Sequence, residues 1–163
     1  MLFAPEPISE IHITEDFDCG KSVLNNWLKV RALSNHRNNF IAVMVMHENF
    51  KVRGFYGLAP TAIVPTALPR NIRTGQPPDP IPCLLLGQMA VDISCKGSGL
   101  GTGLLKHAML RSLNAAKLVG GRALLVNAVD DEAAAFWLRR GFLPTRDNPM
   151  VMFRSMADVA RNV

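Results

Sequence analysis

Four glycines alternate with other residues in segment 96–103, whose sequence is KGSGLGTG. Alternate glycines let successive backbone N–H groups point into one concavity, and a helix that follows adds the positive end of its dipole. Such a cradle suits a phosphate group. We therefore predict that segment 96–103, called the glycine loop below, binds phosphate. The alternative is a flexible turn, which needs fewer glycines.

The spacing of these glycines narrows the choice of phosphate ligand. A dinucleotide-binding loop needs the pattern G-x-G-x-x-G, but the residues three positions after Gly99 and Gly101 are Thr102 and Leu104. A P-loop ends in Gly-Lys-Ser/Thr, whereas Gly103 is followed by two leucines. What remains is a diphosphate bound by the backbone alone, as that of coenzyme A can be.

Strand and helix patterns alternate on both sides of the glycine loop. A very apolar strand is predicted at 83–91, with Gly87 as a bulge or close approach, and the helix after the loop ends at Gly120. Other strands are predicted at 40–46, 54–59, 123–128 and from 142 onward, especially 151–153. One further helix is predicted to begin near Lys21, with Asp18 as its cap. Another is predicted to begin after its cap, Asp130 or Asp131. This order predicts a mixed α/β fold with a sheet covered by helices.

Composition favours one compact domain. The chain has 163 residues, 48% of them hydrophobic, which is enough for one buried core. We expect a cytoplasmic protein without a membrane segment, because no apolar run reaches the roughly 18 residues that a crossing helix needs. The cysteines are odd in number and lack metal-ligand spacing, so neither a disulfide framework nor a metal site is predicted. They are Cys19, Cys83 and Cys95.

Positive charge is concentrated in a few segments. The net charge is +5, and residues 19–47 and 93–129 contain no carboxylate. Segment 64–82 carries six prolines, so it is predicted as a long excursion, and we expect it to face the substrate. These segments favour a polyanionic partner, with a solvated basic surface as the alternative.

Several motifs are similar to those of a known superfamily. LLLGQMAVD at 84–92, KGSGLG at 96–101, AFW at 135–137 and RGF at 140–142 resemble the GNAT acetyltransferases. FDCG at 17–20, RAL at 31–33, LPR at 68–70, PDPIP at 78–82 and DNPM at 147–150 resemble, more narrowly, the GNAT toxins of toxin–antitoxin pairs. The resemblance covers nearly the whole chain. It predicts one GNAT N-acetyltransferase domain over residues 1–163, with a central, mostly antiparallel sheet.

The resemblance implies transfer of an acetyl group from acetyl-CoA to the free amine of an aminoacyl-tRNA, which blocks translation. It also implies a ribbon-helix-helix antitoxin as partner, and a homodimer. In the family, the central strand pairs with the pantetheine arm and offers an N–H to the thioester oxygen, a role that falls to Val91 here. The residues implied to bind acetyl-CoA are Met89, Ala90, Val91, Lys96, Gly97, Ser98, Gly99, Leu100, Gly101, Thr102, Gly103, Asn127 and Phe136. For Asn127, a mere polar strand end is the alternative.

The acceptor is expected to bind basic residues. Candidates are Arg31 and Arg37 on the predicted first helix, and Arg70 and Arg73 on the proline-rich excursion. A tRNA-borne amine fits them, because phosphate contacts need Lys and Arg. An acetyltransferase for a small-molecule amine is the alternative.

One position departs from the family pattern. The family's general acid is a tyrosine directly after the phenylalanine of the penultimate helix, and Trp137 stands there. An indole N–H donates a hydrogen bond but no proton, whereas a phenol with a pKa near 10 can give one. Tyr56, the only tyrosine, is the candidate acid, with a core aromatic as the alternative. A weakly active or inactive acetyl-CoA-binding protein, acting with the antitoxin in a DNA-bound repressor complex, therefore stays open.

Overall fold

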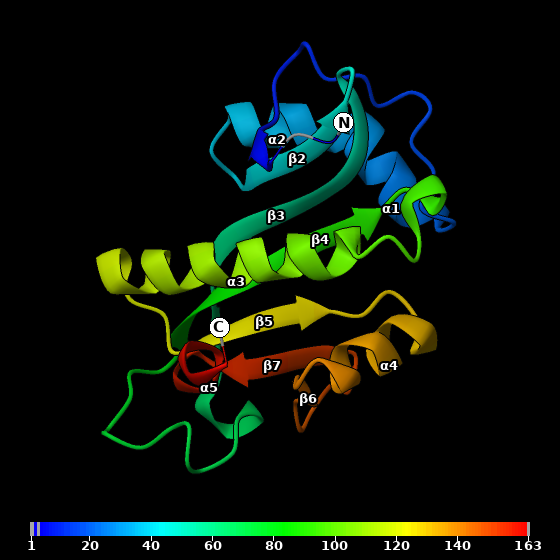
Figure 1. Ribbon diagram of the computed structural model, residues 1–163. Helices are drawn as coiled ribbons and strands as arrows, with labels where there is room; N and C mark the ends of the chain where they lie inside the picture. Colours follow the sequence, from blue (N-terminus) through cyan, green and yellow to red (C-terminus); the bar gives the residue numbers. More distant parts are fainter. Residues whose placement is uncertain (1, 3, 163) are drawn as a thin grey trace. The chain divides into compact units, whose positions relative to one another are not determined.

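The computed structural model describes residue 2 and residues 4–162. Seven strands form a sheet in the order β1-β2-β3-β4-β5-β7-β6 (Figure 1). The strands are β1 (Glu6–Pro7), β2 (Ala42–Glu48), β3 (Lys51–Ile63), β4 (Ile81–Val91), β5 (Ala123–Asn127), β6 (Leu143–Pro144) and β7 (Val151–Ser155). The helices are α1 (Ser22–Trp27), the π-helical η1 (Leu28–Ala32), α2 (Leu33–Arg37), the 3-10 turns η2 (Pro65–Ala67) and η3 (Ile93–Cys95), α3 (Leu100–Val119), α4 (Asp131–Arg139) and α5 (Met156–Arg161).

The sheet is mostly antiparallel. β2 pairs antiparallel with β1 and β3, and β7 pairs antiparallel with β5 and β6. The pairing of β4 with β5 is parallel. The predicted fold class, a mixed α/β fold with a mostly antiparallel sheet and helices, is confirmed.

The Cα positions group the chain into two compact units. Unit 1 contains the chain up to Ala59 together with Gln88–Ala108, and unit 2 contains Pro60–Gly87 and the chain from Met109 onward. β3, β4 and α3 each run from one unit into the other. The glycine loop therefore belongs to unit 1, and α4 belongs to unit 2.

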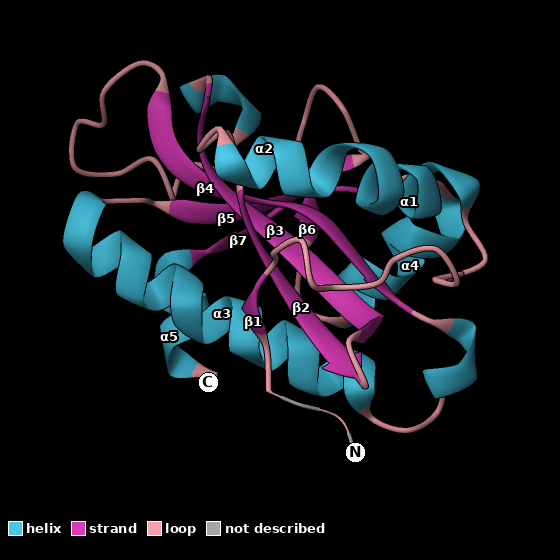
Figure 2. Cartoon of the chain, turned by 90° about the horizontal axis from the view of Figure 1, so that it is seen from above, coloured by secondary structure: helices cyan, strands magenta, loops and turns pink. Residues whose placement is uncertain are grey.

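In unit 1, the side chains of β3 alternate between two covered faces. Phe55 is fully buried on one face, where its ring stacks on Trp27 at 5.9 Å and meets Phe17 edge-on at 5.5 Å between centroids. Tyr56 points to the other face and contacts His107 of α3. As a result, α1 and the first half of α3 cover opposite faces of β3 (Figure 2).

The start of α1 differs from the prediction. α1 begins at Ser22, and the side chain of its N-cap residue, Lys21, makes no capping hydrogen bond. The prediction that Asp18 caps this helix is wrong, because Gly20 at a φ of +88° turns the chain between the two. The Asp18 carboxylate instead accepts hydrogen bonds from the Gly20 N–H at 2.8 Å and from Asn25 Nδ2 at 3.0 Å. Asp130, by contrast, caps α4 as predicted, accepting the Ala133 N–H.

In unit 2, the proline-rich excursion is anchored to the core. Leu68 and Ile72 are buried in one hydrophobic cluster with β4, β5 and β7 residues. The Nε of Arg122 donates to the Ile72 carbonyl at 2.6 Å, so the excursion is an ordered part of this unit. None of the described helices combines the length and the apolar character that a bilayer crossing requires.

Candidate functional site

The glycine loop leads from the end of β4 into α3. The 3-10 turn Ile93–Cys95 follows β4, and α3 begins inside the loop at Leu100. Gly97 and Gly99 have φ values of +78° and +83°, which residues with a side chain rarely adopt. Glycine is therefore required at these two positions to turn the chain into the helix.

Several loop amides lack a hydrogen-bond acceptor in the part of the chain that the structure describes. The N–H groups of Gly97, Gly101 and Thr102 donate to no acceptor among the described residues. They lie at the start of a helix of 20 residues, where backbone donors carry partial positive charge. The side chain of Lys96 is exposed beside them. These groups can together bind a phosphate, so the geometry supports the predicted cradle.

The end of β4 offers a backbone edge next to this loop. Among the described residues, the β4–β5 ladder covers only Leu84 to Leu86 and so ends before Gly87, where the sequence predicts a bulge or close approach. Beyond it, Ala90 is buried in the core of unit 1, whereas Met89 and Val91 are partly exposed. A strand released from its neighbour can pair with an extended ligand.

Tyr56 lies inside unit 1. Its side chain is fully buried, and its hydroxyl is 2.7 Å from Nδ1 of His107. Burial of a phenol with a hydrogen-bonded hydroxyl is what a core tyrosine shows. The geometry thus favours the structural alternative over the acid. His107 was not singled out from sequence, because no local pattern relates it to a residue 51 positions away.

Trp137 is packed in an aromatic cluster of unit 2. It is 7% exposed and meets both Phe136 and Phe142 edge-on, at 5.1 Å between centroids. The Arg140 guanidinium lies 4.6 Å from the centre of the Phe136 ring, a cation–π contact. Asn127 is exposed at the end of β5. The geometry therefore describes Trp137 as a packing residue, in agreement with the inability of an indole to give a proton.

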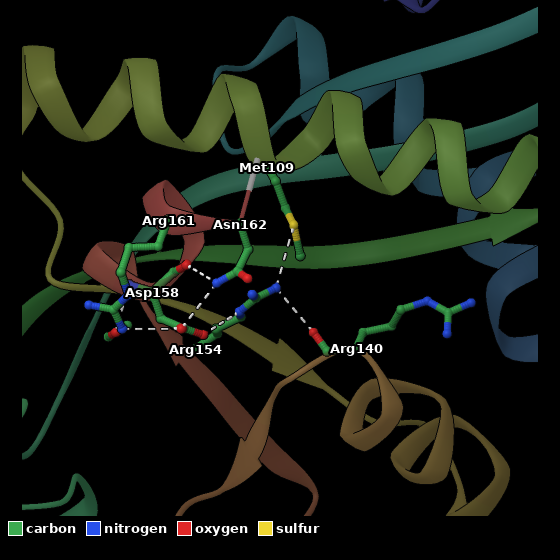
Figure 3. Close-up of polar contacts among 7 residues, drawn as sticks. Met109, Arg140, Arg154, Asp158, Arg161 and Asn162 are labelled. Carbon is green, nitrogen blue, oxygen red and sulfur yellow. Dashed lines mark hydrogen bonds and ion pairs between the residues drawn. The ribbon is translucent and has the colours of Figure 1, made fainter.

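The C-terminal end of α4 is held by Arg154 of β7 (Figure 3). Arg154 donates through Nη1 to the Arg140 carbonyl at 3.1 Å and through Nε to Asp158 of α5 at 2.7 Å. Gly141, at a φ of +88°, leaves room for this guanidinium, because an added Cβ would lie 3.2 Å from its Nε and Cζ. The network thus fixes the helix that carries Phe136 and Trp137.

The four candidate acceptor-binding arginines lie in different units. Arg31 and Arg37 are exposed on η1 and α2 of unit 1, and Arg37 forms an exposed ion pair with Glu10 at 3.2 Å. Arg70 is exposed on the excursion of unit 2, whereas Arg73 is partly buried and its Nε has no hydrogen-bond partner among the described residues. Three of the four side chains are thus accessible to a polyanion.

One further polar cluster, Glu6 with His12 and His47, has the residue types of a metal site. Each histidine places Nε2 on Glu6 Oε1, at 2.8 Å for His12 and 2.6 Å for His47. Each Nδ1 accepts a backbone N–H, from Ser9 and Phe50 respectively. The proton of each neutral ring is thereby assigned to Nε2, which leaves no lone pair there for a metal. The cluster therefore joins β1 to β2 through side-chain hydrogen bonds.

Comparison with known proteins gives relatives over almost the full length. No protein-family model matches the chain. A tRNA-acetylating toxin of Mycobacterium tuberculosis (strain ATCC 25618 / H37Rv) is 36% identical over 155 residues, which cover 95% of this chain and 93% of the relative.

Solved structures of similar proteins show the same fold. AtaT complexed with acetyl-methionyl-tRNAfMet superposes with a TM-score of 0.90 at 27% identity, covering 99% of both chains. A tyrosine-to-phenylalanine mutant of AtaT bound to acetyl-CoA and to the C-terminus of the antitoxin AtaR has a TM-score of 0.82 at 26% identity, covering 99% of this chain and 97% of that one.

Proposed function

Because this chain belongs to the family of GNAT-type tRNA-acetylating toxins, we propose that it transfers the acetyl group of acetyl-CoA to the free amine of an aminoacyl-tRNA. The observation that carries the proposal is the glycine loop, whose amides at the start of α3 have no acceptor within residues 2 and 4–162, with the exposed Lys96 beside them. A family relative is a tRNA-acetylating toxin, and AtaT has been solved with acetyl-methionyl-tRNA. Acetylation of that amine would block translation.

Acetyl transfer needs a positioned thioester, a neutral amine and donors for the developing oxyanion. Loop amides and Lys96 bind the diphosphate of acetyl-CoA, while the β4 backbone from Met89 to Val91 pairs with its pantetheine arm. The Val91 N–H is the proposed donor to the thioester oxygen, and Asn127 and Phe136 of unit 2 stay predicted contacts of acetyl-CoA. The neutral amine attacks the carbonyl carbon, the carbon–sulfur bond breaks, and the amine nitrogen gives its extra proton to water.

No side chain is needed to protonate the departing thiolate. A coenzyme A thiolate resembles a free thiol of pKa about 8.5, so it leaves tolerably and takes a proton from water. This accounts for Trp137 at the family's tyrosine position and for the burial of Tyr56. The consequence is a slower enzyme, since general acid catalysis typically contributes about 10² to 10⁴ in rate.

Charge and homology together suggest the partners. Exposed Arg31, Arg37 and Arg70 suit the phosphates of tRNA, and partly buried Arg73 is a further candidate contact. A ribbon-helix-helix antitoxin is the proposed protein partner, because the similar toxin AtaT has been solved bound to the C-terminus of the antitoxin AtaR. We place the protein in the cytoplasm, where charged tRNA is found, and propose that it acts as a homodimer.

Labelled acetyl-CoA and total charged tRNA test the proposal. We expect label in the tRNA fraction, as an amide on the esterified amino acid, and none on deacylated tRNA. Raising the salt concentration should weaken acceptor binding steeply, because phosphate contacts release counterions. Label on small amines alone, or rates that ignore ionic strength, would contradict the tRNA acceptor.

One observation favours a second function. Trp137 stands where the family has its acid and packs against Phe136 and Phe142, as expected of a protein that only binds acetyl-CoA and acts with its antitoxin on DNA. Calorimetric binding of acetyl-CoA without any labelled product would support this function over the enzyme.

A further inference from the structure

We infer that Asp92, the residue directly after β4, is a positioning residue whose carboxylate holds the glycine loop in its ligand-binding conformation. The inference rests on the proposed function, because the ligand of the loop is acetyl-CoA. Asp92 does not itself reach the ligand in this account. It acts on the chain on both sides of it, and all of its partners lie in unit 1.

Asp92 is a buried carboxylate with several donors around it. It is 4% exposed. Its Oδ2 accepts the N–H and the hydroxyl of Ser94 at 3.0 and 2.5 Å, and its Oδ1 accepts the Asp18 N–H at 2.9 Å. The Arg53 guanidinium lies 3.9 Å from Oδ2. Burial, the largest influence, raises the pKa of Asp92, but the bonds from Ser94 and Asp18 outweigh it and lower the pKa, so the group is ionised at neutral pH.

These bonds connect the entrance of the glycine loop to a distant turn. The Ser94 bonds cap the 3-10 turn that leads into the loop. The Asp18 bond is returned by the Ile93 N–H, which donates to the Asp18 carbonyl at 2.8 Å. Segments 18–20 and 92–96 are thereby clamped side by side, although more than 70 residues separate them in sequence.

The clamp explains the FDCG motif at 17–20, which acetyl transfer does not use. Phe17 is 1% exposed and anchors the turn in the core of unit 1. A Cβ added to Gly20 would lie 3.9 Å from Lys96 Nζ and equally close to Ile93. The turn therefore lies against the side chain of Lys96, the cation of the phosphate site.

A loop that depends on two glycines with positive φ needs such support. Glycine has more backbone freedom than any other residue, so an unsupported loop spends part of its time in other conformations. The apparent Kd for the ligand then rises by the inverse of the competent fraction. Once acetyl-CoA is bound, the chemistry is unchanged, so KM changes and kcat does not.

The variant Asp92→Asn tests this role by calorimetric titration with acetyl-CoA. Ser94 and Asp18 donate to different oxygens of the carboxylate, and asparagine keeps only one of these as an acceptor, so at least one donor loses its partner. We expect the Kd to rise about tenfold, the size expected for a hydrogen bond to a charged group. KM for acetyl-CoA should rise by a similar factor, whereas kcat should stay within about twofold of the wild-type value. Ser94→Ala, which removes one exposed hydroxyl, should show a smaller rise of the same kind.

A matched core variant separates positioning from loss of stability. Val43→Ala truncates a fully buried residue of the same unit, on β2, and should lower stability without changing the Kd. A folded Asp92→Asn with the wild-type Kd would overturn the inference, as would an equal rise in Val43→Ala. If Asp92→Asn does not fold, Ser94→Ala takes its place, and a wild-type Kd in that variant would overturn the inference. Wild-type protein that binds no acetyl-CoA would overturn the proposed function, and this inference with it.

Discussion

Tyr56→Phe removes one hydroxyl from the core of unit 1 and leaves the ring in place. That hydroxyl lies 2.7 Å from His107 Nδ1, and the Tyr56 side chain is fully buried. Loss of a buried hydrogen bond whose partner stays behind costs about 1 to 3 kcal/mol. We therefore expect the free energy of unfolding to fall by about 1 to 2 kcal/mol.

The effect on catalysis distinguishes the two roles of Tyr56. If the phenol were the general acid, its removal would lower kcat about 10² to 10⁴-fold. A buried structural phenol predicts a kcat within about twofold of the wild type. Urea unfolding measures the first quantity, and initial rates of tRNA acetylation at saturating acetyl-CoA measure the second.

His107→Ala provides the partner variant. If the two side chains act as a pair, the stability losses of Tyr56→Phe and His107→Ala should not add in the double variant, because each removes the same interaction. A kcat that falls a hundredfold in Tyr56→Phe, at unchanged stability, would refute the structural interpretation.

Three further changes have expected outcomes. Trp137→Tyr restores a phenol at the family's position and should raise kcat up to about a hundredfold. An unchanged kcat would contradict the explanation that the missing general acid slows the enzyme. Gly141→Ala introduces a Cβ at a φ of +88° and 3.2 Å from the Arg154 guanidinium. Urea unfolding should therefore show a loss of about 1 to 3 kcal/mol in the free energy of unfolding. Gly103→Ala is the control and should show no loss, because an added Cβ would have nothing within 4 Å. The hydrogen bond from His12 lowers the pKa of Glu6 below its ordinary value of 4.5, so Glu6 stabilises the fold above that value and loses this effect as the pH falls through the lowered pKa. The stability gap between wild type and Glu6→Gln should accordingly narrow below about pH 4.5; a gap that does not change with pH would contradict it.

The glycine loop and the main strands were predictable because their signals are local. Four glycines in eight residues, followed by an amphipathic segment, define a helix start and its unpaired amides without reference to the rest of the chain. The apolar run 83–91 likewise predicts a central strand, and the structure has β4 at Ile81–Val91. The family was identified from sequence motifs that resemble those of the GNAT toxins.

Of the two shortest strands, β1 was not predicted, and β6 lies inside the single strand that was predicted from 142 onward. β1 and β6 have two residues each and exist only through pairing with β2 and β7. No periodicity can appear in two residues. The prediction that Asp18 caps the first helix failed for another reason. Aspartate commonly caps helices, but this carboxylate accepts a hydrogen bond within its own turn.

Sequence alone identified the family and the missing tyrosine and predicted the phosphate-binding loop, since each depends on residues that are neighbours in the chain. Only the tertiary structure decided which side chains support them. Tyr56 meets His107, and Asp92 meets Asp18, across 51 and 74 positions. Such contacts arise where strands and helices pack, and no spacing rule along the chain encodes a distance through space.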